Sequence, residues 1–152
     1  MPEVLFYHLT ESRLEEALPD LLERSLARGW RAVVQCVTTE RRDALDQHLW
    51  TFREDSFLPH ATDAAASAAT LQPVLLTTDP AQRANDPQVR FMVEGASPEA
   101  GWGDAKRGVY LFDGHDDHQL QLARERWRAE KAAGNDITYW QQTEDRRWAK
   151  RA

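Results

Sequence analysis

The sequence lacks the features that mark membrane-bound and secreted proteins. It has no uninterrupted apolar run of about 18 residues, so it predicts no membrane-spanning helix. The N-terminal segment, MPEVLFYHLT, has no basic residues ahead of its apolar ones and is unlike a secretory signal. The single cysteine, Cys36, cannot form an internal disulfide and lies in the apolar run AVVQCV, which favours a buried thiol in a reducing compartment. We therefore expect a cytoplasmic protein.

Glycine is absent from the place where nucleotide-binding domains need it. The apolar run Val4–Leu9 predicts a first strand, and the turn that follows it reads HLTESR. A phosphate-binding loop has glycines at this turn so that backbone N–H groups can approach the phosphate. Neither the dinucleotide fingerprint nor the P-loop is present. The sequence therefore predicts an α/β domain without the loop that usually binds a nucleotide.

Sequence patterns typical of catalytic sites are also scarce. Nucleophile elbows and Cys–His pairs are missing, and the best candidate for a metal centre is the run His115-Asp116-Asp117-His118. Two histidines at i and i+3 with two carboxylates can hold a divalent ion, which leaves a metal-dependent hydrolase or nuclease as an alternative function. The simpler interpretation is that the aspartates cap a helix N-terminus, where its dipole favours negative charge. Because no second spaced ligand set accompanies this run, we expect no metal, no cofactor and no catalytic residues.

The charge of the chain is unevenly distributed. The 152 residues are 41% hydrophobic and 29% charged, as in an ordinary globular domain, and the net charge is −6. That sign argues against broad or sequence-specific nucleic-acid binding, which requires a basic surface. Residues 1–119 hold 11 Lys and Arg against 20 Asp and Glu, whereas residues 120–152 hold 8 against 5. We therefore expect an anionic partner of limited size to bind the net-positive C-terminal segment.

Apolar periodicity predicts strands that alternate with helices. The predicted strands are Val4–Leu9, Trp30–Thr38, Pro73–Thr78, Val89–Glu94 and Gly108–Phe112. Three helices are predicted. The first begins at a capping box formed by Ser12 and Glu15 and ends at Gly29. The second covers residues 40–50, and the third runs from Asp116 or Asp117 to Ala133. This order predicts an α/β fold, a single-domain three-layer sandwich with a largely parallel sheet.

One segment fits neither a helix nor a strand and is rich in aromatic residues. Leu49–His60, LWTFREDSFLPH, carries Trp50, Phe52 and Phe57 with no clean period beyond Phe52. Aromatic residues in a loop are costly to leave in water, so the loop either folds back as a lid on the core or builds an apolar pocket. We expect it to do both.

The predicted last helix offers the second half of such a pocket. Helical spacing places Leu120, Arg124, Trp127, Arg128 and Lys131 on one face. A tryptophan between two arginines is either a core-covering arrangement or a clamp for a ligand with an apolar side chain and a carboxylate. The first interpretation is the more common one, and the nearby aromatic loop favours the second.

These segments also resemble a known family. LDQHLWTFREDSFLPH and LARERWRAEKAAG, together with LFYHLT and ARGWRAVVQC, are similar to the chi subunit of bacterial DNA polymerase III over nearly the whole chain. The resemblance implies a Rossmann-like fold without a nucleotide-binding glycine loop, over residues 1–140, with residues 141–152 as an unassigned extension. It also implies a non-catalytic accessory protein of the clamp-loader assembly.

The resemblance implies two partners and one binding site. The partners are the psi subunit and the acidic C-terminal tail of the single-stranded-DNA-binding protein, which ends in an apolar residue and a free carboxylate. The family's tail site corresponds here to Trp50, Phe57, Arg124, Trp127 and Arg128. We expect these side chains to form one notch where the aromatic loop meets the last helix. A plain interaction domain, whose partner binds the C-terminal extension, stays open as a further alternative.

Overall fold

The computed structural model describes residues 2–53, 58–65, 69–99 and 101–152. The helices are α1 (Leu14–Ala27), α2 (Thr39–Thr51) and α3 (Asp117–Ala132), with a short 3₁₀ turn at Ala69–Leu71. The strands are β1 (Glu3–Leu9), β2 (Ala32–Gln35), β3 (Ala61–Thr62), β4 (Val74–Thr77), β5 (Val89–Val93), β6 (Arg107–Asp113), β7 (Asp136–Gln142) and β8 (Trp148–Lys150). None of the helices in this part of the chain combines the length and the apolar character needed to cross a bilayer.

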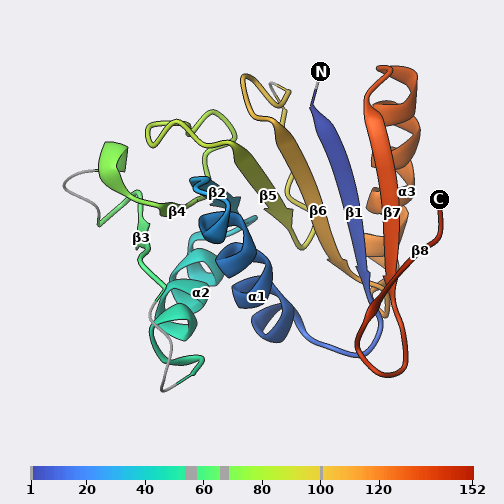
Figure 1. The fold of residues 1–152 in the computed structure, drawn as a ribbon, viewed down its shortest axis with the longest axis horizontal. Coiled ribbons are helices and arrows are strands. Elements are labelled where there is room, and N and C mark those ends of the chain that lie inside the picture. The colour runs from blue at the N-terminus through green and yellow to red at the C-terminus, as the bar shows by residue number, and fades with distance from the viewer. Residues whose placement is uncertain (1, 54–57, 66–68, 100) are drawn as a thin grey trace.

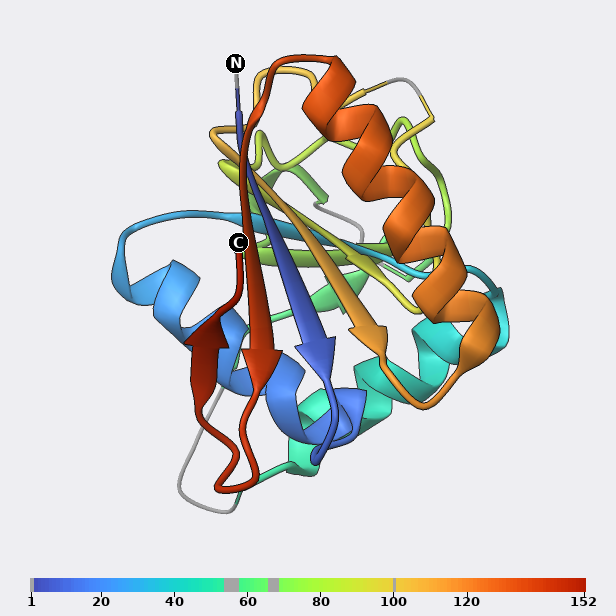
Figure 2. The same ribbon diagram turned by 90° about the vertical axis from the view of Figure 1, so that its right-hand side faces the viewer.

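The described strands form one twisted sheet in the order β3-β4-β2-β5-β6-β1-β7-β8 (Figure 1). Every pairing is parallel except that of β7 with β8, which is antiparallel. Parallel strands need covered faces, and here α1 and α2 lie on one face while α3 lies on the other (Figure 2). The prediction of an α/β three-layer sandwich with a largely parallel sheet is confirmed.

Each face of the sheet has its own hydrophobic core. The larger core packs apolar side chains of α1 and α2, such as Leu18 and Leu49, on alternate residues of β2, β4, β5 and β6. The smaller core lies under α3 and is aromatic, with Phe6, Trp102 and Tyr110 as members. Side chains on successive strand residues point to opposite faces, so β1, β5 and β6 contribute residues to both cores.

The order of the strands decides on which face each helix lies. The connections through α1 and α2 carry the chain from β1 toward the β3 edge, whereas α3 carries it from β6 past β1 to β7, toward the β8 edge. Crossovers between parallel strands are almost always right-handed, so opposite directions of travel place helices on opposite faces. This rule separates α3 from α2 by the thickness of the sheet.

The predicted elements are present, and three strands were not predicted. All five predicted strands and all three predicted helices occur within a few residues of their expected bounds. The short edge strand β3 and the C-terminal strands β7 and β8 were missed. Six of the seven residues of β7 are exposed or half-buried, because it lies next to the short edge strand β8, so its sequence lacks the apolar run of a central strand. Residues 141–152, unassigned from the sequence, complete the sheet.

The expected capping box at Ser12 and Glu15 is wrong by one residue. The helix begins at Leu14, and the Glu16 carboxylate accepts a hydrogen bond from the backbone N–H of Arg13 at 3.2 Å. Ser12 has another role, because its hydroxyl accepts a hydrogen bond from the Gln142 side chain at 2.9 Å. The prediction from local sequence failed because the Ser12 hydroxyl is hydrogen-bonded to Gln142, a residue 130 positions away in the chain.

A buried carboxylate connects α3 to the sheet. One Glu130 side-chain oxygen accepts hydrogen bonds from the Trp102 indole and the Tyr110 hydroxyl, each at 3.0 Å, and the other accepts one from Asn135 at 2.6 Å. Burial and the nearby Glu130 charge raise the pKa of Tyr110, so its hydroxyl stays a donor. The Trp102 ring packs on Gly108, where an added Cβ would lie 2.6 Å from the ring.

We predict that Glu130→Ala lowers the free energy of unfolding by about 3 kcal/mol, because it leaves two buried donors without an acceptor. Glu125→Ala, an exposed position on the same helix, is the control and should change stability by less than about 0.5 kcal/mol. Urea unfolding followed by circular dichroism measures both. Equal stability of the two variants would contradict the structural role of Glu130.

Candidate functional site

The exposed face of α3 presents two neighbouring arginines. Arg124 and Arg128 are one helical turn apart and both are exposed. Within the described part of the chain, neither makes an ion pair or a hydrogen bond through its guanidinium. Both guanidinium groups therefore keep their donors available to a ligand on this face.

Trp127 lies between these arginines and connects the helix surface to the smaller core. Its ring meets Phe6 edge-on at 5.4 Å between centroids and Tyr139 of β7 edge-on at 5.7 Å. The side chain is half-buried, so its inner edge packs on the sheet while part of it stays in contact with solvent. Both sequence interpretations of this tryptophan are thus compatible with the structure: it covers the core, and it leaves an aromatic surface beside two cations.

The charge of Arg124 acts on His8 of β1 and on Tyr139 of β7. The Tyr139 hydroxyl lies 2.8 Å from the His8 Nδ1 atom. Burial lowers the pKa of His8, and the positive charges of His115 and Arg124 lower it further. Burial raises the pKa of Tyr139, and Arg124 partly opposes that shift. His8 and Tyr139 therefore belong to the same surface, although the sequence analysis named neither; the alternation of Ile137 and Tyr139 was the signal for β7.

The aromatic loop folds back on the opposite face of the sheet. Leu58 is 2% exposed and joins the larger core. The buried His60 ring places Nδ1 2.6 Å from the Leu58 carbonyl oxygen and Nε2 2.9 Å from that of Asp46 in α2. The lid that was expected from the sequence is therefore confirmed for this part of the loop.

Trp50 stands out on this same side of the molecule. It lies at the end of α2 and is 49% exposed, while its ring centroid lies 4.3 Å from that of His60. The buried histidine thus supports a large aromatic ring that faces solvent. Phe57, the other predicted loop residue, falls outside the described residues.

The expected single notch is wrong. Trp50 belongs to the layer of α1 and α2, whereas Arg124, Trp127 and Arg128 belong to α3 on the other side of the sheet (Figure 2). The physical reason is the right-handed crossover: the chain reverses its direction across the sheet before α3, so the two helices cannot share a face. Those of the predicted residues that the structure describes therefore lie on two separate surfaces.

The turn after β1 holds a side chain where nucleotide-binding domains hold a phosphate. The backbone N–H groups of Thr10, Glu11 and Ser12 lie 3.3, 3.0 and 2.9 Å from one atom, the Gln142 side-chain oxygen. Gln142 comes from the end of β7, and it is 5% exposed. These donors are satisfied by the protein itself.

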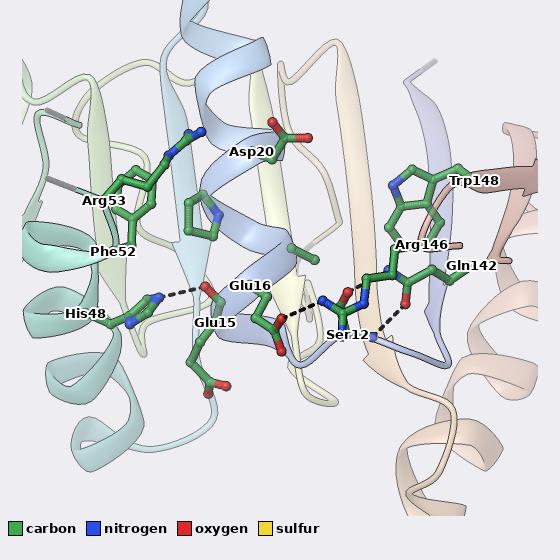
Figure 3. A pocket seen from close by; sticks show the side chains of 12 residues that line it. Ser12, Glu15, Glu16, Asp20, His48, Phe52, Arg53, Gln142, Arg146 and Trp148 are labelled. Atoms are coloured by element: carbon green, nitrogen blue, oxygen red, sulfur yellow. Dashed lines mark hydrogen bonds and ion pairs between the residues drawn. The ribbon is translucent and has the colours of Figure 1, made fainter. Parts of the chain in front are cut away.

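A cavity of about 360 Å³ lies beside this turn, along α1 (Figure 3). On one side of α1, His48 contacts the Glu15 carbonyl oxygen through Nε2 at 2.6 Å; on the other, Arg146 pairs with Glu16 at 3.3 Å. The ion pair between Glu16 and Arg146 joins two residues of the cavity wall and ties the β7–β8 hairpin to α1.

The candidate metal run has structural roles. Asp116 caps α3 by accepting a hydrogen bond from the Gln119 backbone N–H at 3.0 Å. His115 contacts the Thr10 carbonyl oxygen at 2.6 Å. Among the described residues, no group of three or more His, Cys, Asp or Glu is placed to hold a metal ion. The capping interpretation of Asp116 is confirmed.

The comparison with known families decides the identity. A family model described as the DNA polymerase III chi subunit, HolC, matches residues 1–138. The chain belongs to this family. It is therefore an accessory subunit of DNA polymerase III and takes part in DNA replication. A search of curated proteins returned no significant match. The family match ends inside β7, so the second half of that strand and all of β8 lie beyond it.

We predict that Arg124→Gln raises the pKa of His8, because it removes a positive charge that disfavours the imidazolium. Histidine ring signals in a proton NMR titration measure this pKa, and Arg13→Gln, at the N-terminus of α1, is the control. The folded His8 pKa lies below its ordinary value of 6.5, so the unfolded chain binds more protons there. The contribution of His8 to the free energy of unfolding is therefore present above about pH 6.5 and is lost as the pH falls. If the pKa of His8 were unchanged in Arg124→Gln, the placement of Arg124 near His8 would be contradicted.

Proposed function

We propose that this chi-family chain is a non-catalytic, cytoplasmic adaptor of the clamp-loader assembly that links the replicase to single-stranded-DNA-binding protein. It binds that protein's acidic C-terminal tail and pairs with the psi subunit. The observation that carries the proposal is that Arg124 and Arg128, which pair with no acidic group among the described residues, lie beside the half-buried Trp127 on α3.

The chemistry of the α3 surface matches the tail. A guanidinium binds a carboxylate through two parallel hydrogen bonds, and an aromatic ring gives an apolar side chain a surface to pack on. Arg124 supplies the first and the exposed part of Trp127 supplies the second, while Arg128 extends the positive charge by one turn. In a protein with a net charge of −6, acidic side chains of the tail prefer this net-positive segment.

The tail should bind weakly. One anchor side chain and a few rim charges provide a small interface, which corresponds to a dissociation constant on the order of micromolar. Exposed charge pairs are screened by salt, so the affinity should fall as the ionic strength rises. Weak tethering suits a subunit that must release its partner as the replicase moves.

The surface around Trp50 is assigned to the psi subunit in this proposal. A tryptophan that is 49% exposed and rests on a buried histidine is a typical anchor for a protein partner. Trp50 is in α2, which packs on the larger core, whereas α3 packs on the smaller core, so we assign the two surfaces to different partners.

We predict that Arg124→Gln weakens binding of an acidic peptide with a C-terminal aromatic residue about tenfold, the value of one charge-assisted hydrogen bond. Tryptophan fluorescence or calorimetry measures the dissociation constant. Arg13→Gln, an exposed arginine on α1, is the matched control and should bind as the unchanged chain does. Saturable binding that Arg124→Gln leaves unaltered would rule out the α3 site.

We predict that Trp50→Ala weakens pairing with psi at least about tenfold, because an interface tryptophan commonly contributes more than 1.4 kcal/mol. Arg124→Gln should leave that pairing within about twofold, and Trp50→Ala should leave peptide binding within the same range. Analytical ultracentrifugation of the mixed subunits measures the pairing. Loss of both activities in either variant, with unchanged thermal stability, would show that the two partners share one surface.

A further inference from the structure

A pocket under the C-terminal half of α1 carries a charge pattern that neither partner surface explains. It has a volume of about 200 Å³ and lies on the α1 face of the sheet. Phe91 and Val109, both in the larger core, form an apolar floor. Three arginines, Arg24, Arg28 and Arg107, line the same pocket. They come from α1 and from the start of β6, so the tertiary fold brings them together.

The three guanidinium groups are only partly neutralised. Arg107 donates through Nε to Glu3 at 2.8 Å, and Arg24 pairs with Asp20 at 3.2 Å on the surface. Arg28 pairs with no acidic residue in the described ranges. Each paired arginine uses one of its five N–H groups for its carboxylate, so most of the donors around the pocket stay available.

Trp30 contacts two of these arginines. The guanidinium carbon of Arg28 lies 4.2 Å from the centroid of the Trp30 ring, and that of Arg107 lies 5.0 Å from it. Both contacts are of the cation–π type, which orients a planar guanidinium. The two cations are therefore positioned by the same ring.

Tyr7 adds a donor that the protein does not use. Its ring lines the pocket and is fixed by an edge-on contact with Trp148 at 4.9 Å. The hydroxyl forms no hydrogen bond with any residue that the structure describes, and the side chain is half-buried. Burial raises its pKa, and Arg107 and Arg24 partly oppose this, so the hydroxyl is protonated and within electrostatic reach of both arginines.

A structural role explains some of these residues. Cations in the last turns of a helix are favoured by its dipole, which accounts for Arg24 and Arg28. The dipole does not account for the donors that Arg107 keeps beyond its pair with Glu3, or for the Tyr7 hydroxyl, which bonds to no described residue. These two observations point to an oxygen-rich, negatively charged ligand.

We propose that this pocket binds a phosphate monoester, with the phosphate held by Arg28, Arg107 and Tyr7 and the first carbons of the ester on Phe91 and Val109. A phosphate carries a charge of about −1.5 to −2 and three acceptor oxygens, which several donors from different directions can satisfy. A planar carboxylate is satisfied by a single arginine and leaves the others without a partner. A volume of about 200 Å³ is below the range of drug-sized sites, so it suits a phosphate and a small organic group.

Phenyl phosphate is the probe that tests this proposal. Calorimetry on the full chain should show one saturable site with a dissociation constant of about a millimolar or tighter. Benzoate, which has the same ring and a carboxylate, should bind at least about tenfold more weakly. Arg28→Gln and Tyr7→Phe should each weaken binding of phenyl phosphate, the arginine variant by about tenfold.

Two controls separate this site from the rest of the molecule. Arg13→Gln removes an exposed arginine at the other end of α1, and Arg124→Gln removes one from the α3 surface; both should bind phenyl phosphate unchanged. Arg28 is exposed, so its replacement should leave the fold intact, which a thermal melt checks. The proposal is overturned by no saturation at about ten millimolar ligand, by equal affinity for benzoate, or by full affinity in both Arg28→Gln and Tyr7→Phe.

Discussion

Both faces of the parallel sheet must be covered by helices, and the crossovers between its strands are right-handed. Together these two constraints determine on which face each helix lies. From β1 the chain moves toward the β3 edge and lays α1 and α2 on one face. It then returns through β5 and β6 and passes beyond β1, which places α3 on the other face. Any function shared by α2 and α3 must therefore act from two sides of the molecule. The proposed division into an α3 surface for a peptide tail and a Trp50 surface for a protein subunit follows from this constraint.

The sequence predicted the strands and helices whose apolar periodicity lies within consecutive residues. Buried strands such as Val89–Val93 and amphipathic helices such as Leu14–Ala27 carry their period in consecutive residues, so fold class and most elements were accessible. The pairing of Trp50 with Arg124 was a statement about strand order, which no local pattern encodes, and it was wrong. Helical spacing placed Arg124, Trp127 and Arg128 together on α3. The contact of Trp127 with Tyr139 could not be predicted, because the half-exposed sequence of β7 hid that strand.

The turn after β1, which lacks the glycines of a phosphate-binding loop, is held by the C-terminal strands. In nucleotide-binding domains the turn after the first strand offers its N–H groups to a phosphate. Here the Gln142 side chain accepts from that turn, and the hairpin of β7 and β8 extends the sheet at the same place. Arg146 of this hairpin pairs with Glu16 on α1, which closes the connection between the C-terminal segment and the first helix. The part of the chain beyond the family match thus supports the turn that the first helix starts from.

The central claim is that two partners bind opposite faces of the molecule at the same time. The most direct test compares two dissociation constants of the acidic peptide, one for the chain alone and one for the chain saturated with psi. Independent surfaces predict dissociation constants that agree within about twofold, because sites without shared contacts are additive. A loss of more than about tenfold upon saturation with psi, reproduced in reverse by excess peptide displacing psi, would contradict the account and return both partners to one shared site.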